Sequence, residues 1–136
     1  MKNYDDVIGI DVSKLTIDAH MHKRALHRVF SNTPKGYEAL LLWIDKYLEA
    51  QYYFICFEDT GHYSTNLSVY LSEKDIDYVE ENPLAIKSAA RIVRGKTDRL
   101  DAGIIARYAW LHKEELVVGI PYEKDIHELG RLVSLR

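Results

Sequence analysis

The sequence has few of the features that mark secreted or membrane proteins. Its one cysteine, Cys56, excludes an intramolecular disulfide and a cysteine-based zinc site. Uninterrupted apolar runs such as 39–44 are far shorter than the roughly 18 residues that cross a bilayer. The first residues also do not combine a basic start with an apolar run. We therefore expect no membrane span and no secretion signal, and we expect a cytoplasmic protein.

The chain also has little net charge. Its 18 Lys and Arg oppose 21 Asp and Glu, for a net charge of −3, which argues against a polycation that coats nucleic acid. The charge is uneven, because residues 83–113 hold 7 basic and 2 acidic side chains. With 136 residues, 47% of them hydrophobic, the chain can form one domain with an ordinary core.

Apolar patterns predict a mixed sheet with helices packed on it, because three strands in a meander precede alternating helices and strands. Thr33 and Pro34 form a helix start, since threonine caps well and proline suits the first helical position. The segment 15–21 alternates, with Leu15 facing the core. The expected strands are 7–12, 15–21, about 26–30, 52–57 and 77–80, and the expected helices begin at Thr33-Pro34, around residue 67, at Asn82-Pro83 and at Thr97, the last running to about Leu111.

Four acidic residues stand where a charge is unfavourable. Asp11 ends one hydrophobic strand, and Glu58 or its neighbour Asp59 ends another. Asp98 and Asp101 are three residues apart in the fourth predicted helix, on the apolar stripe that should face the sheet. Each also has an ordinary explanation: Asp11 as a turn residue, Glu58 and Asp59 as solvated loop, and Asp98 as an acid in a first helical turn.

Burying several carboxylates together costs several kcal/mol or more unless a partner compensates. Hard divalent cations are the natural partner, and Mg²⁺, with Mn²⁺ as a substitute, takes oxygen ligands and keeps waters for a substrate. Two such ions about 3.5–4 Å apart can activate a water and stabilise the leaving oxygen of a phosphodiester. The carboxylates therefore predict a metal-dependent phosphoryl-transfer site.

Basic side chains lead towards the Asp98–Asp101 pair. On the third predicted helix they are spaced four and three apart, opposite an apolar side that includes Ala85 and Ala89. A phosphate backbone held by them would pass the metal site. The alternative is a solvated, solubilising helix face. The candidate nucleic-acid-binding residues are Lys87, Arg91, Arg94, Lys96 and Arg99.

Three motifs resemble the N-terminal domain of the insertion sequence 110 family of transposases. They are G-I-D-V-S-K at 9–14, F-E-D-T-G-H-Y at 57–63 and K-T-D-R-L-D-A-G-I-I-A-R-Y-A at 96–109, and the stretch N-T-P-K-G-Y-E-A-L-L-L-W-I at 32–44 is similar to the first-helix region of that family. The resemblance implies a RuvC-like, ribonuclease H-like α/β fold with a D-E-D-D tetrad that binds Mg²⁺. The tetrad falls on Asp11, Glu58, Asp98 and Asp101, so the motif favours Glu58 over Asp59.

The resemblance also implies partners and further domains. Relatives include a pilin-gene invertase, and members act on DNA under the direction of a structured bridge RNA. Family members continue into a coiled coil and a C-terminal domain with a catalytic serine, and no serine of this chain matches that motif. We therefore expect a catalytic domain at 1–113, the start of a helical or coiled-coil connection at 114–136, an incomplete reaction without the rest, and a homo-oligomer in the full-length protein.

Two other hypotheses stay open. V-I-G-I-D-V-S-K at 7–14 resembles the first phosphate loop of actin-like sugar kinases, but the glycine-rich motifs that such a kinase needs later in the chain are not visible. A noncatalytic nucleic-acid-binding or dimerisation module would use the same carboxylates structurally. Metal binding distinguishes this module from a transposase domain.

Overall fold

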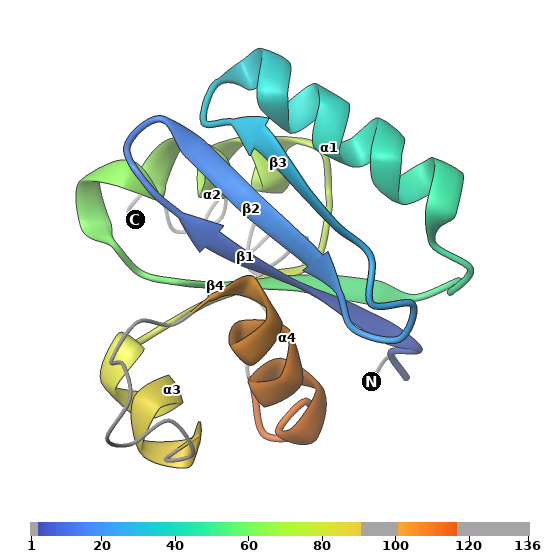
Figure 1. Cartoon of the computed structure of the whole chain (residues 1–136), viewed down its shortest axis with the longest axis vertical. Coiled ribbons are helices and arrows are strands. Elements are labelled where there is room, and N and C mark those ends of the chain that lie inside the picture. The colour runs from blue at the N-terminus through green and yellow to red at the C-terminus, as the bar shows by residue number, and fades with distance from the viewer. Residues whose placement is uncertain (1–2, 91–100, 117–136) are drawn as a thin grey trace, which may run out of the picture.

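One mixed sheet organises the part of the chain that the computed structural model describes, residues 3–90 and 101–116. The strand order is β3-β2-β1-β4-β5 (Figure 1). Strands β1, β2 and β3 pair antiparallel, whereas β4 and β5 join parallel to β1. The predicted mixed sheet is confirmed. The strands are β1 (Asp6–Val12), β2 (Thr16–Met21), β3 (His27–Ser31), β4 (Tyr53–Glu58) and β5 (Tyr78–Glu81), and the helices are α1 (Pro34–Tyr47), η1 (Gly61–Tyr63), α2 (Thr65–Glu73), α3 (Pro83–Ala90) and α4 (Ala102–Leu111).

Helix α1 begins where the sequence predicts. The Thr33 side chain accepts a hydrogen bond from the Gly36 amide at 3.2 Å, and Pro34 occupies the first turn. Tyr37, Leu40 and Ile44 recur at helical spacing and are buried, and Trp43 is buried with them. The helix packs closely, because a Cβ on Gly36 would lie 1.9 Å from the Ser31 carbonyl oxygen.

Leu15 does not belong to a strand, contrary to its predicted place in the core. The Ser13 amide donates to the Thr16 carbonyl at 2.9 Å, and the Ser13 hydroxyl donates to the same oxygen. These bonds close the β1–β2 turn one residue later than expected. Leu15 therefore lies in the turn, with 74% of its surface exposed.

The helices cover the two faces of the sheet in pairs (Figure 1). One core lies between the sheet and α1 and α2, and includes Ile10 and Phe57. The other lies between the sheet and α3 and α4, and includes Phe54, Cys56 and Ile105. Cys56 is a buried core residue, and burial raises the pKa of its thiol to about 12.

Helix α4 begins later than predicted. Its first residue is Ala102, and Asp101 is the N-cap, with an extended backbone at φ −94° and ψ 173°. The expectation that Asp101 lies within the helix, beyond its first turn, is therefore wrong. The Asp101 side chain caps the N-terminus of α4 by accepting a hydrogen bond from the Ile104 amide at 2.8 Å. Thr97 and Asp98 lie outside the described residues.

Among the described residues, no helix is long and apolar enough to cross a membrane.

Candidate functional site

Asp11 and Glu58 lie on the same face of neighbouring parallel strands. Gly9 of β1 stands opposite Cys56 of β4, so Asp11 and Glu58 are each two residues further along. Side chains two residues apart in a strand share a face. Since Cys56 faces the core under α3 and α4, Glu58 and Asp11 face that side too, at the carboxyl ends of their strands.

The electrostatics place the two carboxylates near each other. Glu58 is half-buried, and its pKa is raised first by burial and then by the negative charge of Asp11. The positive charge of Lys87, which is exposed on α3, acts in the opposite direction. Because the charge of Asp11 makes the ionised form of Glu58 less favourable, added positive charge is favourable at this site.

Asp59 has a different role from its neighbour. Its side chain accepts a hydrogen bond from the Gly61 amide at 2.8 Å, and its own amide donates to the Glu81 carbonyl at 2.8 Å. Gly61 has φ +66°, a left-handed conformation that glycine adopts without strain. Asp59 therefore shapes the turn after β4, whereas Glu58 remains on the sheet.

The N-terminus of α4 lies directly over β1. A Cβ on Gly9 would lie 2.4 Å from both the Ala102 carbonyl oxygen and the Ala106 amide nitrogen, so only glycine permits this approach. Gly9 precedes Asp11 by two residues, and Ala102 follows Asp101. The packing therefore brings Asp101 to the same face of the sheet as Asp11 and Glu58.

A cavity of about 320 Å³ opens between the start of α4 and strands β2 and β3. His20 stands opposite His27 in the β2–β3 pair, and the rings are 6.5 Å apart. Burial and the nearby His27 lower the pKa of His20, and Asp101 opposes that shift. The cavity is lined by Asp18, His20, His27, Asp101, Ala102 and Gly103.

Two further acidic residues face the same side, and the sequence analysis missed both. Asp18 is the β2 partner of Asp11, and Glu81 is the β5 partner of Glu58. The Glu81 carboxylate accepts a hydrogen bond from the Tyr108 hydroxyl at 2.6 Å. Strand pairing is the signal that could have found them, since each stands beside a predicted site residue.

The described residues do not complete a metal centre. Within 3–90 and 101–116, no three His, Cys, Asp or Glu side chains are grouped so that they could hold a metal ion. Asp98 lies outside these ranges. The donor set of Asp11, Glu58 and Asp101 nevertheless fits a hard cation in kind, because it consists of carboxylates that face one side of the sheet.

Of the predicted basic residues, only Lys87 is described. It is exposed on α3, while Arg91, Arg94, Lys96 and Arg99 lie outside the described residues. The apolar side of this helix is narrower than predicted, because Ile86 is fully buried whereas Ala85 and Ala89 are exposed. Among residues 83–89, the part of this helix whose burial is described, Ile86 is the one that belongs to the core under α3 and α4.

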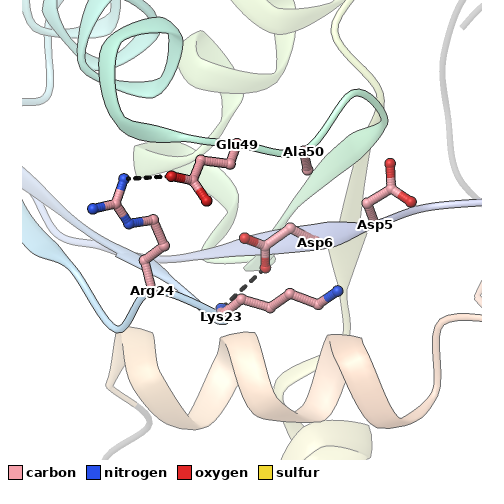
Figure 2. Close-up of a pocket in the computed structure, with 6 residues that line it drawn as sticks. All are labelled: Asp5, Asp6, Lys23, Arg24, Glu49 and Ala50. Carbon is pink, nitrogen blue, oxygen red and sulfur yellow. Dashed lines mark hydrogen bonds and ion pairs between the residues drawn. The ribbon is translucent and has the colours of Figure 1, made fainter.

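A second cavity, of about 260 Å³, lies near the amino end of β1 (Figure 2). Charged side chains that line it have ion-pair or hydrogen-bond partners. Arg24 Nη1 lies 3.7 Å from Glu49 Oε2, and the Lys23 amide donates to Asp6 Oδ1 at 3.1 Å. Asp6 is buried and also accepts from the Val7 amide at 2.8 Å. These contacts stabilise the β2–β3 turn, at the end of β1 away from Asp11.

Comparison with a solved structure identifies the fold. T. thermophilus RuvC, in complex with a Holliday junction substrate, matches with a TM-score of 0.55 and 13% identity. The match covers 84% of this chain and 99% of that chain. The predicted RuvC-like, ribonuclease H-like fold is therefore confirmed.

Sequence comparison identifies the family. A family model described as "Transposase", for DEDD proteins of the insertion sequence 110 type, matches residues 8–136. The pilin gene-inverting proteins of Moraxella bovis and Moraxella lacunata are each 34% identical over 110 residues, which is 74% of this chain and 33% of theirs. The chain thus spans about a third of the length of these curated relatives. The match favours the transposase hypothesis over the sugar-kinase one: the chain belongs to the insertion sequence 110 family of DEDD transposases.

Proposed function

We propose that this domain binds Mg²⁺ and holds a DNA phosphate for phosphoryl transfer during transposition. The observation that carries the proposal is the placement of Asp11 and Glu58 on one face of adjacent parallel strands, where burial and the charge of Asp11 raise the pKa of Glu58. A divalent cation, Mg²⁺ or Mn²⁺, would offset that repulsion.

Each carboxylate has a distinct part in this proposal. Asp11 is the central ligand, since its strand lies between β2 and β4. Glu58 is the second ligand. Asp101 uses Oδ1 to cap α4, which leaves Oδ2 for a cation, and Asp98 completes the tetrad. Metal ions held there would activate a nucleophile and stabilise the leaving oxygen of a phosphodiester.

The basic side chains hold the DNA backbone in this proposal. Lys87 is close enough to Glu58 to affect its pKa, so a phosphate on Lys87 would lie near the carboxylates. Arg91, Arg94, Lys96 and Arg99 would extend that contact towards Asp98. Each phosphate contact adds to the salt dependence of binding. Neutralising Lys87 and Arg91 should therefore weaken DNA binding and reduce its dependence on salt, and salt-insensitive binding would contradict this role.

We further propose that the domain, residues 1–113, works within a larger protein. The match covers only 33% of the length of its relatives, which are named for inverting a pilin gene. In this proposal, residues 114–136 lead into a helical or coiled-coil connection, and strand exchange needs a serine supplied by the other part. A bridge RNA and a homo-oligomer belong to the same proposal.

Metal titration tests the site. We expect Mn²⁺ to bind this chain, and Asp11→Asn and Asp101→Asn to weaken that binding by at least about 10-fold. Asp18→Asn is the matched control, because Asp18 pairs with Asp11 on the same face and is outside the tetrad. Equal weakening by Asp18→Asn would mean that general negative charge, and not the tetrad, attracts the ion.

A cleavage assay tests the reaction. Branched and linear DNA would be incubated with Mg²⁺ and either this chain or a longer chain that contains it. We expect efficient cutting only by the longer chain, and loss of that cutting in Asp11→Asn. Efficient cutting by the 136 residues alone would contradict the dependence on a second part.

One observation favours a second candidate function, a noncatalytic nucleic-acid-binding or dimerisation module. The described residues contain no ready group of three metal ligands. In that case the carboxylates would be structural, as Asp101 is when it caps α4. Failure of this chain to bind Mn²⁺ at millimolar concentration, together with retained DNA binding or self-association, would favour the module.

A further inference from the structure

Asn32 connects three segments that are distant in sequence. It lies between β3 and α1, and its side-chain nitrogen donates to the Ser13 carbonyl at 2.8 Å and to the Tyr63 carbonyl at 3.0 Å. Its side-chain oxygen accepts a hydrogen bond from the Tyr37 hydroxyl. Its backbone amide donates to the Leu15 carbonyl at 2.9 Å. One residue thus joins the β1–β2 turn, η1 and α1.

The orientation of the amide follows from its partners. Ser13 and Tyr63 each present a carbonyl oxygen, which accepts hydrogen bonds, and the nitrogen of a primary amide supplies two N–H donors. The Tyr37 hydroxyl then serves the amide oxygen, and burial raises the pKa of Tyr37, which keeps the hydroxyl protonated. The reverse orientation would place oxygen against two carbonyls.

The segments that Asn32 joins follow the two strands that carry carboxylates. Ser13 comes two residues after Asp11, and Tyr63 comes five residues after Glu58. Both segments lie at the same end of the sheet (Figure 1). The turn after Glu58 is otherwise fixed to its own strand and to β5, through Asp59 and through the Ser64 hydroxyl, which donates to Glu80 at 2.8 Å. Asn32 ties that turn to the end of β1.

We propose that Asn32 is a positioning residue for the carboxylate site, because its amide fixes the end of β1 relative to the end of β4 and so sets the separation of Asp11 and Glu58. The proposal rests on the metal-binding function proposed above. Ligand groups must be held within about 0.5 Å of the productive geometry, and a connection between their two strand ends supplies that restraint.

Hydrogen exchange tests the connection without any metal. In Asn32→Ala, amide exchange should become about 10-fold faster in both 13–16 and 61–64, because both segments lose a hydrogen bond to the Asn32 side chain. Thr33→Ala is the matched control, because it removes the neighbouring cap of α1 and should speed exchange only in the first turn of that helix. Unchanged exchange in either segment would overturn the proposal.

Mn²⁺ affinity then separates positioning from stability alone. Asn32→Ala should weaken Mn²⁺ binding by about 10-fold, and Thr33→Ala by less than about 2-fold. The two affinities are compared under conditions in which both variants have lost the same amount of thermal stability. Tyr37→Phe, which keeps the buried ring, should give an intermediate weakening and provides a second test if Asn32→Ala folds poorly. Equal affinities in Asn32→Ala and Thr33→Ala would overturn the positioning role. Equal Mn²⁺ binding by the wild type and Asp11→Asn would instead overturn the metal site, and the positioning role with it.

Discussion

The two faces of the sheet are built from alternate residues of the same strands, yet they differ in character. On the face under α1 and α2, the strands contribute large apolar side chains such as Ile8, Ile10 and Phe57, all of them fully buried. The other face is mixed, because Val7, Phe54 and Cys56 are fully buried under α3 and α4, whereas Asp11 and Glu58 follow at the carboxyl ends of the same strands. A single residue step along β1 or β4 therefore moves from the main core to the candidate site.

The difference between the two faces affects the folding free energy. A large apolar core supplies most of the folding free energy, because the hydrophobic contribution scales with buried apolar area. A site that gathers carboxylates opposes folding, because the charges repel and lose solvation. The core under α1 and α2, together with the smaller core under α3 and α4, stabilises the strands whose carboxyl ends carry the charges.

The largest effect should come from removing a core side chain beside a site residue. Phe57→Ala should lower the free energy of unfolding by about 4 kcal/mol, because Phe57 is fully buried between the sheet and the helices. Urea unfolding measures it. Its neighbour Glu58 faces the other side, so Glu58→Gln should change the free energy by less than about 1 kcal/mol. A comparable loss in both variants would mean that the faces are not divided in this way.

A smaller effect should come from adding one methyl group to each of two glycines. Gly9→Ala should cost about 3 kcal/mol, because its Cβ would lie 2.4 Å from backbone atoms of α4 that cannot yield separately. Gly103→Ala should stabilise by about 0.5 kcal/mol, since its Cβ would lie 3.4 Å from the nearest atom, and alanine favours a helix. Thermal unfolding of both variants checks the opposite signs. A neutral Gly9→Ala would mean that α4 is free to shift on the sheet.

Much of the fold could be predicted because its signals are local. The β-branched and aromatic strands ending at Asp11 and Glu58, and the Thr33-Pro34 helix start, are each contained within a few residues. Where the strand bounds differ from the predictions, they differ by one residue. The position of Leu15 was wrong because two hydrogen bonds to the Thr16 carbonyl, and not the apolar pattern, decide where the hairpin turns.

The site depends on contacts between distant residues, which a sequence pattern does not contain. The start of α4 was expected at Thr97, and both threonine and aspartate are good caps, so local propensity does not exclude Asp101. The approach of α4 to Gly9 and the bonds of Asn32 to Ser13 and Tyr63 depend on packing between separate segments. The tetrad itself stays a prediction, because Asp98 lies outside the described residues.

Substitutions of Asp101 can distinguish its effect on stability, as the cap of α4, from its proposed role as a metal ligand. Asp101→Ala should cost about 1 kcal/mol, because it removes the acceptor for the Ile104 amide, as measured by urea unfolding. Asp101→Asn should cost almost nothing, since asparagine caps equally well. Both should weaken Mn²⁺ binding if Asp101 is a ligand. Retained Mn²⁺ affinity in Asp101→Asn would leave this residue with a capping role alone.

The smallest effect concerns His22, which packs on the end of α4 opposite the Asp101 cap. His22 stacks on Trp110 with ring centroids 5.4 Å apart. Its pKa is lowered first by burial and further by Arg107, Lys23 and Lys113, while Asp6 opposes the shift. The unfolded chain therefore takes up the proton at higher pH than the folded chain does, so stability is present above about pH 6.5 and is lost as the pH falls through the folded pKa.

His22→Phe keeps an aromatic ring on Trp110 and removes this titration. The wild type should lose stability more steeply than His22→Phe between about pH 7 and pH 5, by less than about 1 kcal/mol, because the imidazole is partly exposed. His20, whose pKa is also lowered, should leave a residual slope in the variant. Urea unfolding at several pH values, at low and high salt, measures both slopes.

Salt should screen the contribution of the three cations but not that of burial, so a difference between the two proteins that survives high salt would identify desolvation as the main cause. Identical slopes at low salt would show that His22 titrates alike in the folded and unfolded chains.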